Sequence, residues 1–312
     1  MRPHGIMFHH FTDALHPRGQ GALSSAEFRR MIEFLGPERI LPAQDWLDRA
    51  LQGVLRPWDI CLTFDDNLRC QYDVAVPVLQ EFGLTAFFFA YTSVLRGQPE
   101  RLEIYRHFRT TSFSSVDQFY HAFFAALNSS PHQSHVDQSL ADFDPRTYLA
   151  GFPFYTDADR RFRYVRDQAL GPAKYFSVMD QMLAAASIDI PSLSANLWMT
   201  PDHLRDLHRQ NHIVGLHSDT HPTRLADLSP AAQESEYQQN LDDLTRILGS
   251  SPICMSHPCN SYNPHTLRIL RKMGIQLGFR ANMQDTHFSP LEHPREDHAN
   301  LLQRMTHTAA AA

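Results

Sequence analysis

Two aspartates and two histidines stand directly after apolar runs of the sequence. Residues 58–64 form an apolar run that ends at Asp65 and Asp66. Residues 213–216 form another, and His217 and His221 follow it on either side of a Ser-Asp-Thr turn. The carboxyl ends of parallel strands meet at one edge of an α/β fold, so we expect these side chains to lie close together.

These side chains have the chemistry of a metal centre. Asp66, His217 and His221 would supply one oxygen and two nitrogens, a ligand set typical of a catalytic divalent metal ion. Adjacent residues of an extended chain point in different directions, so Asp65 would remain available as a base. The alternative is a structural Asp-Asp-Asn turn at the start of the next helix.

Histidine spacing alone does not identify ligands. With 19 histidines in 312 residues, a pair spaced by four is expected about once by chance. The sequence contains His217/His221 and also His208/His212. The second pair falls on a helix expected from residue 201 to about 212, and we interpret it as part of a solvated helix face.

Charge and composition exclude several classes of protein. A formal net charge of −6 argues against a nucleic-acid binder. The N-terminus lacks a signal-peptide pattern, and no apolar run approaches the ~20 residues that span a bilayer, so we expect a cytoplasmic protein without a transmembrane segment. The cysteines form no CxxC pair, which predicts reduced, buried thiols at Cys61, Cys70, Cys254 and Cys259.

Both ends of the chain alternate between short apolar runs and helical patterns, which predicts a parallel α/β fold. The expected strands are residues 5–10, 58–64, 84–91, 213–217, 253–256 and 275–280, with a shorter one at 40–41. Helix starts are indicated by the capping box Ser24/Glu27 and by proline after Thr200, Ser229 and Asn263. Gly83, Gly249 and Gly274 mark helix ends.

The middle of the chain loses this rhythm. Helices are expected around residues 116–127 and 173–186, with a Ser/His/Asp-rich loop at 128–144 between them. We therefore predict a barrel from residues 1–95 and 197–312, and a helical insertion at 96–196, after the third main strand, that shapes the substrate cleft. Basic and aromatic residues at 160–166 would meet a diphosphate or a uronic acid, or form a solvated helix face with Phe162 and Val165 packed inward.

Three motifs together resemble the polysaccharide deacetylase family (NodB homology domain, carbohydrate esterase family 4). They are Thr63-Phe64-Asp65-Asp66, His217-Ser218-Asp219-Thr220-His221 and Ser256-His257-Pro258-Cys259-Asn260-Ser261-Tyr262. The resemblance covers residues 1–95 and 197–300. It implies a distorted (β/α)7-type barrel and metal-dependent hydrolysis of an N-acetyl group on a sugar.

The resemblance also implies roles for individual residues. Asp66, His217 and His221 would bind one divalent metal ion, zinc first, with cobalt, nickel, iron or manganese as alternatives. Asp65 would be the general base for the attacking water. The backbone N–H of Cys259 would stabilise the oxyanion with the metal, and Asn260 and Tyr262 belong to the same substrate-binding motif.

The sequence departs from the family pattern at three places. Asn67 stands where glycine is usual, and asparagine tolerates a left-handed conformation. Ser256 replaces the arginine that orients the base, so Arg295 and Asp297 are candidates to take over, the alternative being an exposed salt-bridged loop. No Leu-x-His motif closes the chain; His9, after Phe8, resembles the acid of some branches, with His10 as the alternative because strand alternation sends the two to opposite faces.

The leading hypothesis is a metal-dependent N-deacetylase. Its substrate would be an N-acetylated amino sugar in a bacterial surface saccharide such as lipopolysaccharide O-antigen, or a nucleotide- or lipid-linked precursor. One alternative is a sugar N-deformylase with the same mechanism. The other is a catalytically degenerate carbohydrate-binding protein on the same barrel.

Overall fold

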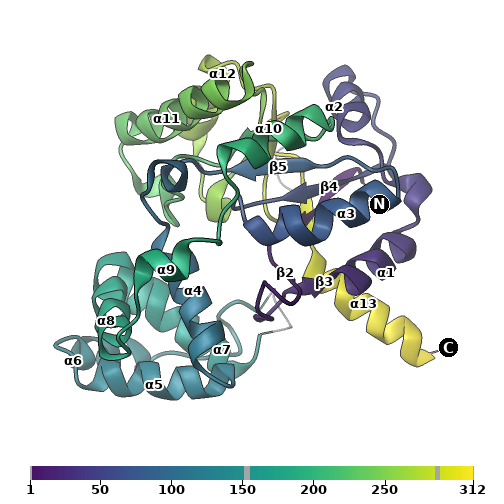
Figure 1. The fold of residues 1–312 in the computed structure, drawn as a ribbon. Helices are drawn as coiled ribbons and strands as arrows, with labels where there is room; N and C mark the ends of the chain where they lie inside the picture. Colours follow the sequence, from purple (N-terminus) through teal and green to yellow (C-terminus); the bar gives the residue numbers. More distant parts are fainter. Residues whose placement is uncertain (1, 151–154, 285–288, 312) are drawn as a thin grey trace. The chain divides into compact units, whose positions relative to one another are not determined.

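The computed structural model describes residues 2–150, 155–284 and 289–311. The chain divides into two compact units: residues 1–100 with 196–312, here the barrel unit, and residues 101–195, here the helical unit. Figure 1 shows the strands and helices of each unit.

Among the described residues, seven parallel strands form the sheet of the barrel unit, in the order β8-β7-β6-β5-β4-β1-β9. Their bounds are β1 His4–Phe8, β4 Ile60–Phe64, β5 Phe87–Ala90, β6 Ile213–Leu216, β7 Cys254–Ser256, β8 Leu277–Phe279 and β9 Arg295–Asp297. His293, two residues before β9, makes a parallel bridge to Phe279 of β8, so the sheet nearly closes. The predicted (β/α)7-type barrel is confirmed.

Two details of the strand prediction were wrong. Strand β9, which pairs with β1, was not among the expected strands. Residues 40–41 form no strand of their own; Ile40 makes an isolated bridge to Ile60. A separate two-stranded sheet joins β2 Phe11–Thr12 to β3 Leu23–Ser24.

Helices flank the barrel strands, and their predicted boundaries have the expected chemistry. They are α1 Ser25–Leu35, α2 Ala43–Gln52, α3 Val76–Glu81, α10 Pro201–Arg209, α11 Pro230–Leu248, α12 Pro264–Lys272 and α13 His298–Ala311. Ser24 and Glu27 form the capping box at the start of α1. Gly83, Gly249 and Gly274 have φ values of 63°, 76° and 83°, the left-handed conformation expected after a helix.

Helix α10 ends earlier than predicted. It stops at Arg209, so His212 does not share a solvated helix face with His208. Instead His212 is buried before β6, and its Nδ1 accepts a hydrogen bond from the Ala86 N–H at 3.0 Å. The buried histidine continues the apolar packing through an edge contact with Phe88.

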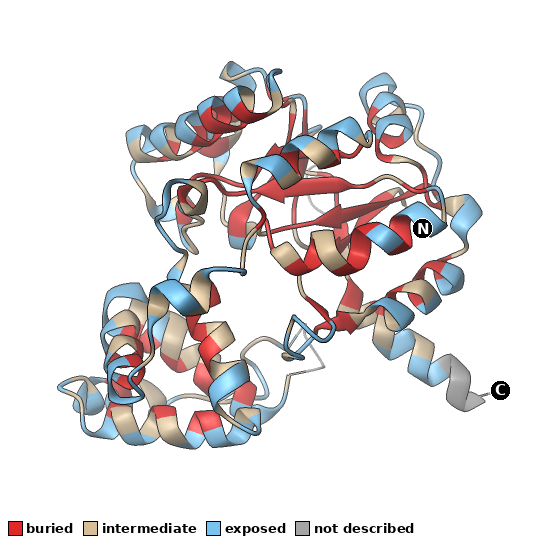
Figure 2. Ribbon diagram, viewed as in Figure 1, coloured by how far each residue is buried: buried red, intermediate tan, exposed pale blue. Residues whose placement is uncertain are grey.

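The barrel core is aromatic. Phe8, Phe11, Phe28 and Phe64 are buried, with ring centroids 5.0–6.2 Å apart. Burying one such side chain contributes about 1.5–3 kcal/mol. Figure 2 shows the consequence: the strands are buried along their length, and the helices expose their outer faces.

The helical unit consists of α4 Arg101–Ser112, α5 Val116–Asn128, α6 Gln133–Leu140, α7 Asp157–Tyr164, α8 Gly171–Ala185 and α9 Ile190–Ser194. The prediction of a loop at 128–144 was wrong, because α6 occupies the centre of this segment. Val136 is the one buried residue of α6. Phe162 and Val165 are buried, and the Arg161 and Arg163 guanidinium groups lie over the rings of Phe124 and Tyr155. These arginines of the 160–166 cluster therefore pack within their own unit.

Within the described ranges, no helix has the length and apolarity that a bilayer span requires.

Candidate active site

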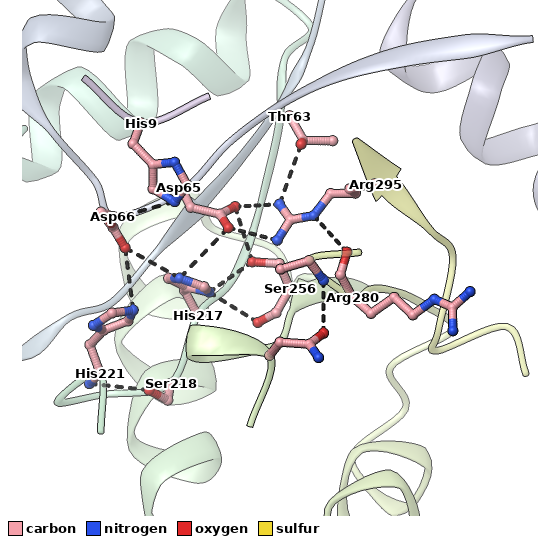
Figure 3. Close-up of polar contacts among 12 residues, drawn as sticks. His9, Thr63, Asp65, Asp66, His217, Ser218, His221, Ser256, Arg280 and Arg295 are labelled. Carbon is pink, nitrogen blue, oxygen red and sulfur yellow. Dashed lines mark hydrogen bonds and ion pairs between the residues drawn. The ribbon is translucent and has the colours of Figure 1, made fainter. Parts of the chain in front are cut away.

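The candidate site lies at the carboxyl ends of neighbouring strands. β4 and β6 both pair with β5, and the chain turns sharply after each of the two. After β4, Asp66 and Asn67 have φ values of 81° and 56°. Asn67 thus has the positive φ that asparagine tolerates, and Asp66 has a positive φ as well. These turns bring Asp66 to the side chains that follow β6 (Figure 3).

Asp66, His217 and His221 form a compact cluster. Asp66 Oδ1 lies 3.3 Å from Nε2 of each histidine, and one ligand atom from each residue lies within 4.8 Å of the others. His217 Nδ1 lies 3.0 Å from the Ser256 carbonyl oxygen, an interaction that orients Nε2 toward Asp66. Asp66 Oδ1 is buried without a hydrogen-bond partner. An unbonded carboxylate oxygen facing two imidazole nitrogens fits a divalent cation.

Burial and neighbouring charges set the protonation of this cluster. Burial raises the pKa of Asp66, but the neighbouring imidazoles of His221, His217 and His9 outweigh burial and hold that pKa far below its usual range. Burial lowers the pKa of His221 to about 4 despite the Asp66 charge. His221 is therefore neutral at pH 7, the form in which imidazole binds metal.

Asp65 faces a different partner. The Arg295 guanidinium donates to both carboxylate oxygens, from NH1 to Oδ1 and from NH2 to Oδ2, at 2.7 Å each. Ser256 donates its hydroxyl to Oδ1 at 3.1 Å. Burial raises the pKa of Asp65, yet the Arg295 and His217 charges lower it overall, so the carboxylate is ionised at neutral pH.

Arg295 is held firmly in this position. Its side chain is 0% exposed, and Nε donates to the Arg280 carbonyl oxygen at 3.1 Å. The alternative of an exposed salt-bridged loop was therefore wrong for Arg295. Asp297 lies elsewhere: its Oδ1 accepts the Ala299 N–H at 2.9 Å and lies 3.4 Å from His298 Nδ1, at the start of α13.

His9 lies on the Asp66 side of the site. Its Nε2 is 4.0 Å from Asp66 Oδ2, and its side chain is 29% exposed. The rings of His9 and His10 stack with centroids 6.3 Å apart, so the expectation of opposite faces was wrong. The physical reason is that β1 ends at Phe8, and the alternation of a strand does not extend to the residues that follow it.

The third motif is bonded to the segment that returns from β8. Asn260 Oδ1 accepts the Ala281 N–H at 2.8 Å, and the Tyr262 hydroxyl donates to Glu292 at 3.1 Å. His257 stacks on Tyr262 with centroids 4.0 Å apart, and burial lowers its pKa to about 3. Cys259 has a φ of 49° and is exposed, which corrects the expectation of four buried thiols; Cys61, Cys70 and Cys254 are buried.

Sequence reasoning missed several residues around the site. Ser256 was noted only because it stands where the family pattern has an arginine. Its Oγ lies 2.7 Å from His217 Nδ1 and donates a hydrogen bond to Asp65. Tyr91, whose ring lies 5.2 Å from that of His221, ends an apolar run of the sequence and was detectable by that position. Asn240 hydrogen-bonds the His217 backbone. The sequence signal for Asn240 was an amide residue among apolar residues that recur at helical spacing.

Comparisons with known proteins agree with the barrel fold. The model of the polysaccharide deacetylase family matches residues 174–278. No curated protein matches the chain. Similar solved structures include the deacetylase PplD of Streptococcus pyogenes, determined in complex with acetate, at 15% identity and a TM-score of 0.57, with 98% of each chain covered.

Two further structures share the fold. IcaB from Ammonifex degensii is 14% identical with a TM-score of 0.55, covering 94% of this chain and 90% of its own. The BpsB deacetylase domain from Bordetella bronchiseptica is also 14% identical, with a TM-score of 0.51 and 94% of each chain covered. The polysaccharide deacetylase model thus matches one part of the chain, and the similar solved structures share its barrel fold.

Proposed function

We propose that this protein is a metal-dependent carbohydrate N-deacetylase. The observation that carries the proposal is the position of an ionised, arginine-bound Asp65 directly beside the Asp66-His217-His221 cluster. The Asp66-His217-His221 cluster has the chemistry to bind a cation, and Asp65 beside it has the chemistry of a general base. Acetate is the product that removal of an N-acetyl group would release, and the complex of PplD with acetate supports that acyl group here.

Asp66, His217 and His221 would hold one divalent metal ion, with zinc as our first choice. Bound there, the metal would act as a Lewis acid toward the acyl oxygen and the attacking water. The chain's own residues supply the proton transfers. Asp65 takes a proton from the water as the water oxygen attacks the acyl carbon. Arg295 keeps the Asp65 carboxylate oriented.

The remaining steps complete the hydrolysis. The backbone N–H of Cys259 is the candidate donor to the oxyanion. His9 donates a proton to the leaving nitrogen as the C–N bond breaks, which yields acetate and a free amine. Asn260 and Tyr262 are candidates for sugar contacts near the same motif. We propose a bacterial surface saccharide, or a nucleotide- or lipid-linked precursor, as the substrate class.

The test combines metal analysis with product analysis. Purified protein is loaded with zinc or cobalt and incubated with N-acetylated amino sugars and oligosaccharides. We expect about one bound metal per chain and metal-dependent release of acetate. Asp65→Asn should lower kcat about 10²–10⁴-fold while metal binding persists, whereas His217→Ala should lose the metal.

Other outcomes distinguish the alternatives. Formate released from N-formyl sugars, with no acetate from N-acetyl sugars, would favour a deformylase. Sugar binding that is unchanged by Asp65→Asn, in a protein that takes up no metal and shows no turnover, would favour a binding protein. Metal-free protein with all three ligands intact, after zinc and cobalt have been offered, would overturn the site assignment.

A further inference from the structure

The loop that carries both candidate histidine ligands is conformationally unfavourable by itself. Within residues 217–221, Ser218 and His221 have φ values of 61° and 55°. Residues other than glycine adopt this region at a cost, and they remain there only when the surrounding structure holds them. The hydrogen bonds around this loop therefore show what holds it.

One face of α11 supplies three polar side chains to this loop. Glu236, Asn240 and Asp243 follow one another at spacings of four and three residues, which places them on one side of a helix. Glu236 Oε2 accepts hydrogen bonds from the backbone N–H groups of Asp219 at 3.1 Å and of Thr220 at 2.9 Å.

Asp243 holds the same loop through an arginine. The Arg96 guanidinium binds Asp243 and also lies 2.6 Å from Asp219 Oδ2. Asp219 thus receives a backbone contact from Glu236 and a side-chain contact from Arg96.

Asn240 stands at the centre of this face and is 0% exposed. Its Oδ1 accepts the His217 N–H at 3.0 Å, and its Nδ2 donates to the Ala90 carbonyl oxygen at 2.9 Å and to Thr92 Oγ1 at 3.1 Å. The Thr92 hydroxyl in turn donates to Asp219 Oδ1 at 2.9 Å. One amide therefore ties the end of β5 to the residue that begins the histidine loop.

Apolar residues of α11 flank Asn240 along the helix. Tyr237, Leu241 and Leu244 of the same helix are buried in the barrel core. A buried amide is unfavourable at such a position unless its hydrogen bonds are made. An apolar side chain here would leave the His217 N–H and the Ala90 carbonyl oxygen without these partners, so what the amide contributes is its three hydrogen bonds.

We propose that Asn240 is a positioning residue for metal binding: it fixes the backbone of His217 relative to β5 so that His217 and His221 meet Asp66. This inference rests on the proposed function, in which those three residues bind a divalent metal. Residues that orient metal ligands typically change metal affinity by about 10–100-fold when they are replaced.

The experiment titrates full-length, metal-free protein with Co²⁺, and follows the visible absorption of the bound ion and its Kd. We compare wild type, Asn240→Leu and the control Gln238→Leu, since Gln238 lies on the exposed side of α11 and pairs only with Asp242 in its described contacts. Asn240→Leu should weaken Co²⁺ binding about 10–100-fold and alter the absorption spectrum. The control should bind as wild type does.

A second pair of variants covers the case in which Asn240→Leu does not fold. Thr92→Val removes the hydroxyl that links Asn240 to Asp219, and Thr92→Ser keeps it. We expect weaker Co²⁺ binding for Thr92→Val, about tenfold at the lower end of the range, and near-complete recovery for Thr92→Ser.

The outcomes separate this inference from the proposed function. Wild-type protein that binds no Co²⁺ would overturn the metal site itself, and this inference with it. Wild type that binds Co²⁺, with folded Asn240→Leu or Thr92→Val binding equally well, would overturn only the role of Asn240. A lowered melting temperature with unchanged Kd and spectrum would show that the amide is merely structural.

Discussion

Asp65 and Arg295 form a buried ion pair across 230 positions of the sequence. Neither side chain is accessible to solvent, so each charge depends on the other for compensation. The pair also determines the chemistry of Asp65. Burial alone would raise the pKa of this carboxyl, and the Arg295 charge is the largest of the opposing influences.

Replacing Arg295 by methionine should therefore affect both stability and pH dependence. Breaking a buried pair leaves an uncompensated charge, and we expect a loss of about 3–5 kcal/mol in the free energy of unfolding at pH 7. The pKa of Asp65 should rise, so the acidic limb of the kcat/KM profile should move to higher pH. Urea unfolding and a pH–rate profile measure the two effects.

The matched control is Arg304→Met. Arg304 pairs with Glu296, two atoms 2.6 Å apart, but its side chain is 53% exposed. Such a pair contributes about 1 kcal/mol or less. If Arg295→Met lost no more stability than Arg304→Met and kept the wild-type pH profile, Arg295 would not compensate Asp65.

Strand β6 positions His217 through its close approach to β7. A Cβ built on Gly215 would lie 2.6 Å from the Cys254 carbonyl oxygen and 2.8 Å from the Phe89 ring. Both neighbours belong to adjacent strands, and both are buried. Gly215→Ala should therefore cost about 1–3 kcal/mol through overpacking. Because His217 follows two residues later, Co²⁺ binding should weaken as well.

Gly249→Asn provides the comparison for Gly215→Ala. Gly249 ends α11 in the left-handed conformation, with no atom within 4 Å of a built Cβ. Asparagine tolerates that conformation, so stability and Co²⁺ affinity should change little. Urea unfolding and Co²⁺ titration of both variants make the measurement. Equal effects of the two substitutions would show that the close approach at Gly215 is unimportant.

The elements that the sequence predicted well are those with a local signal. Strands β4 and β6 read as apolar runs, and α1 and α11 carry caps at their expected positions. Strand β9 had no such signal, because its sequence is Arg-Glu-Asp and its strand conformation depends on pairing with β1. Arg295 could be named as a candidate partner of Asp65, but only the closure of the barrel brings it there.

The remaining errors have a similar cause. Helix α6 is polar except for Val136, so its composition resembles a loop. Helix α10 and strand β1 both end before their predicted last residues. The predictions for His212 and His10 were wrong for that reason. Element boundaries are set by long-range contacts as well as by local preference, and a single residue of error changes which way a side chain points.

At the scale of the whole molecule, buried neutral histidines should make the fold sensitive to acid. Burial lowers the pKa of His212 to about 4, of His293 to about 4 and of His257 to about 3. Between those values and 6.5, the unfolded chain binds protons that the native chain does not. Stability therefore falls as the pH decreases through this window, and rises again with pH up to about 6.5.

His212→Asn tests this linkage at one position. Each unit of pKa difference corresponds to about 1.4 kcal/mol. His212 should therefore lower the free energy of unfolding by about 2 kcal/mol when the pH falls from 7 to 5. The variant does not titrate, and its difference in unfolding free energy between pH 7 and pH 5 should shrink by about that amount. The exposed His121 gives the control, His121→Asn, which should leave the slope unchanged. An unchanged slope for His212→Asn would contradict the linkage.

The division into two units predicts how the molecule responds to removal of one of them. Asp65, Asp66, His217, His221 and their hydrogen-bond partners all belong to the barrel unit. The helical unit has buried aromatic residues of its own, including Phe119, Phe123 and Phe162, whose rings contact one another. We therefore expect a chain in which residues 101–195 are replaced by a short Gly/Ser linker to fold and to bind Co²⁺ with near wild-type Kd.

Saccharide turnover should respond differently from metal binding in this deletion. If the helical unit contributes to substrate binding, KM for N-acetylated oligosaccharides should rise while Co²⁺ affinity persists. Circular dichroism, Co²⁺ titration and acetate release measure folding, metal site and turnover separately, and full-length Asp65→Asn serves as the inactive, metal-binding reference. If the deleted chain did not fold, the barrel core alone would be insufficient to stabilise the barrel unit. The barrel unit would then depend on the helical unit for its stability.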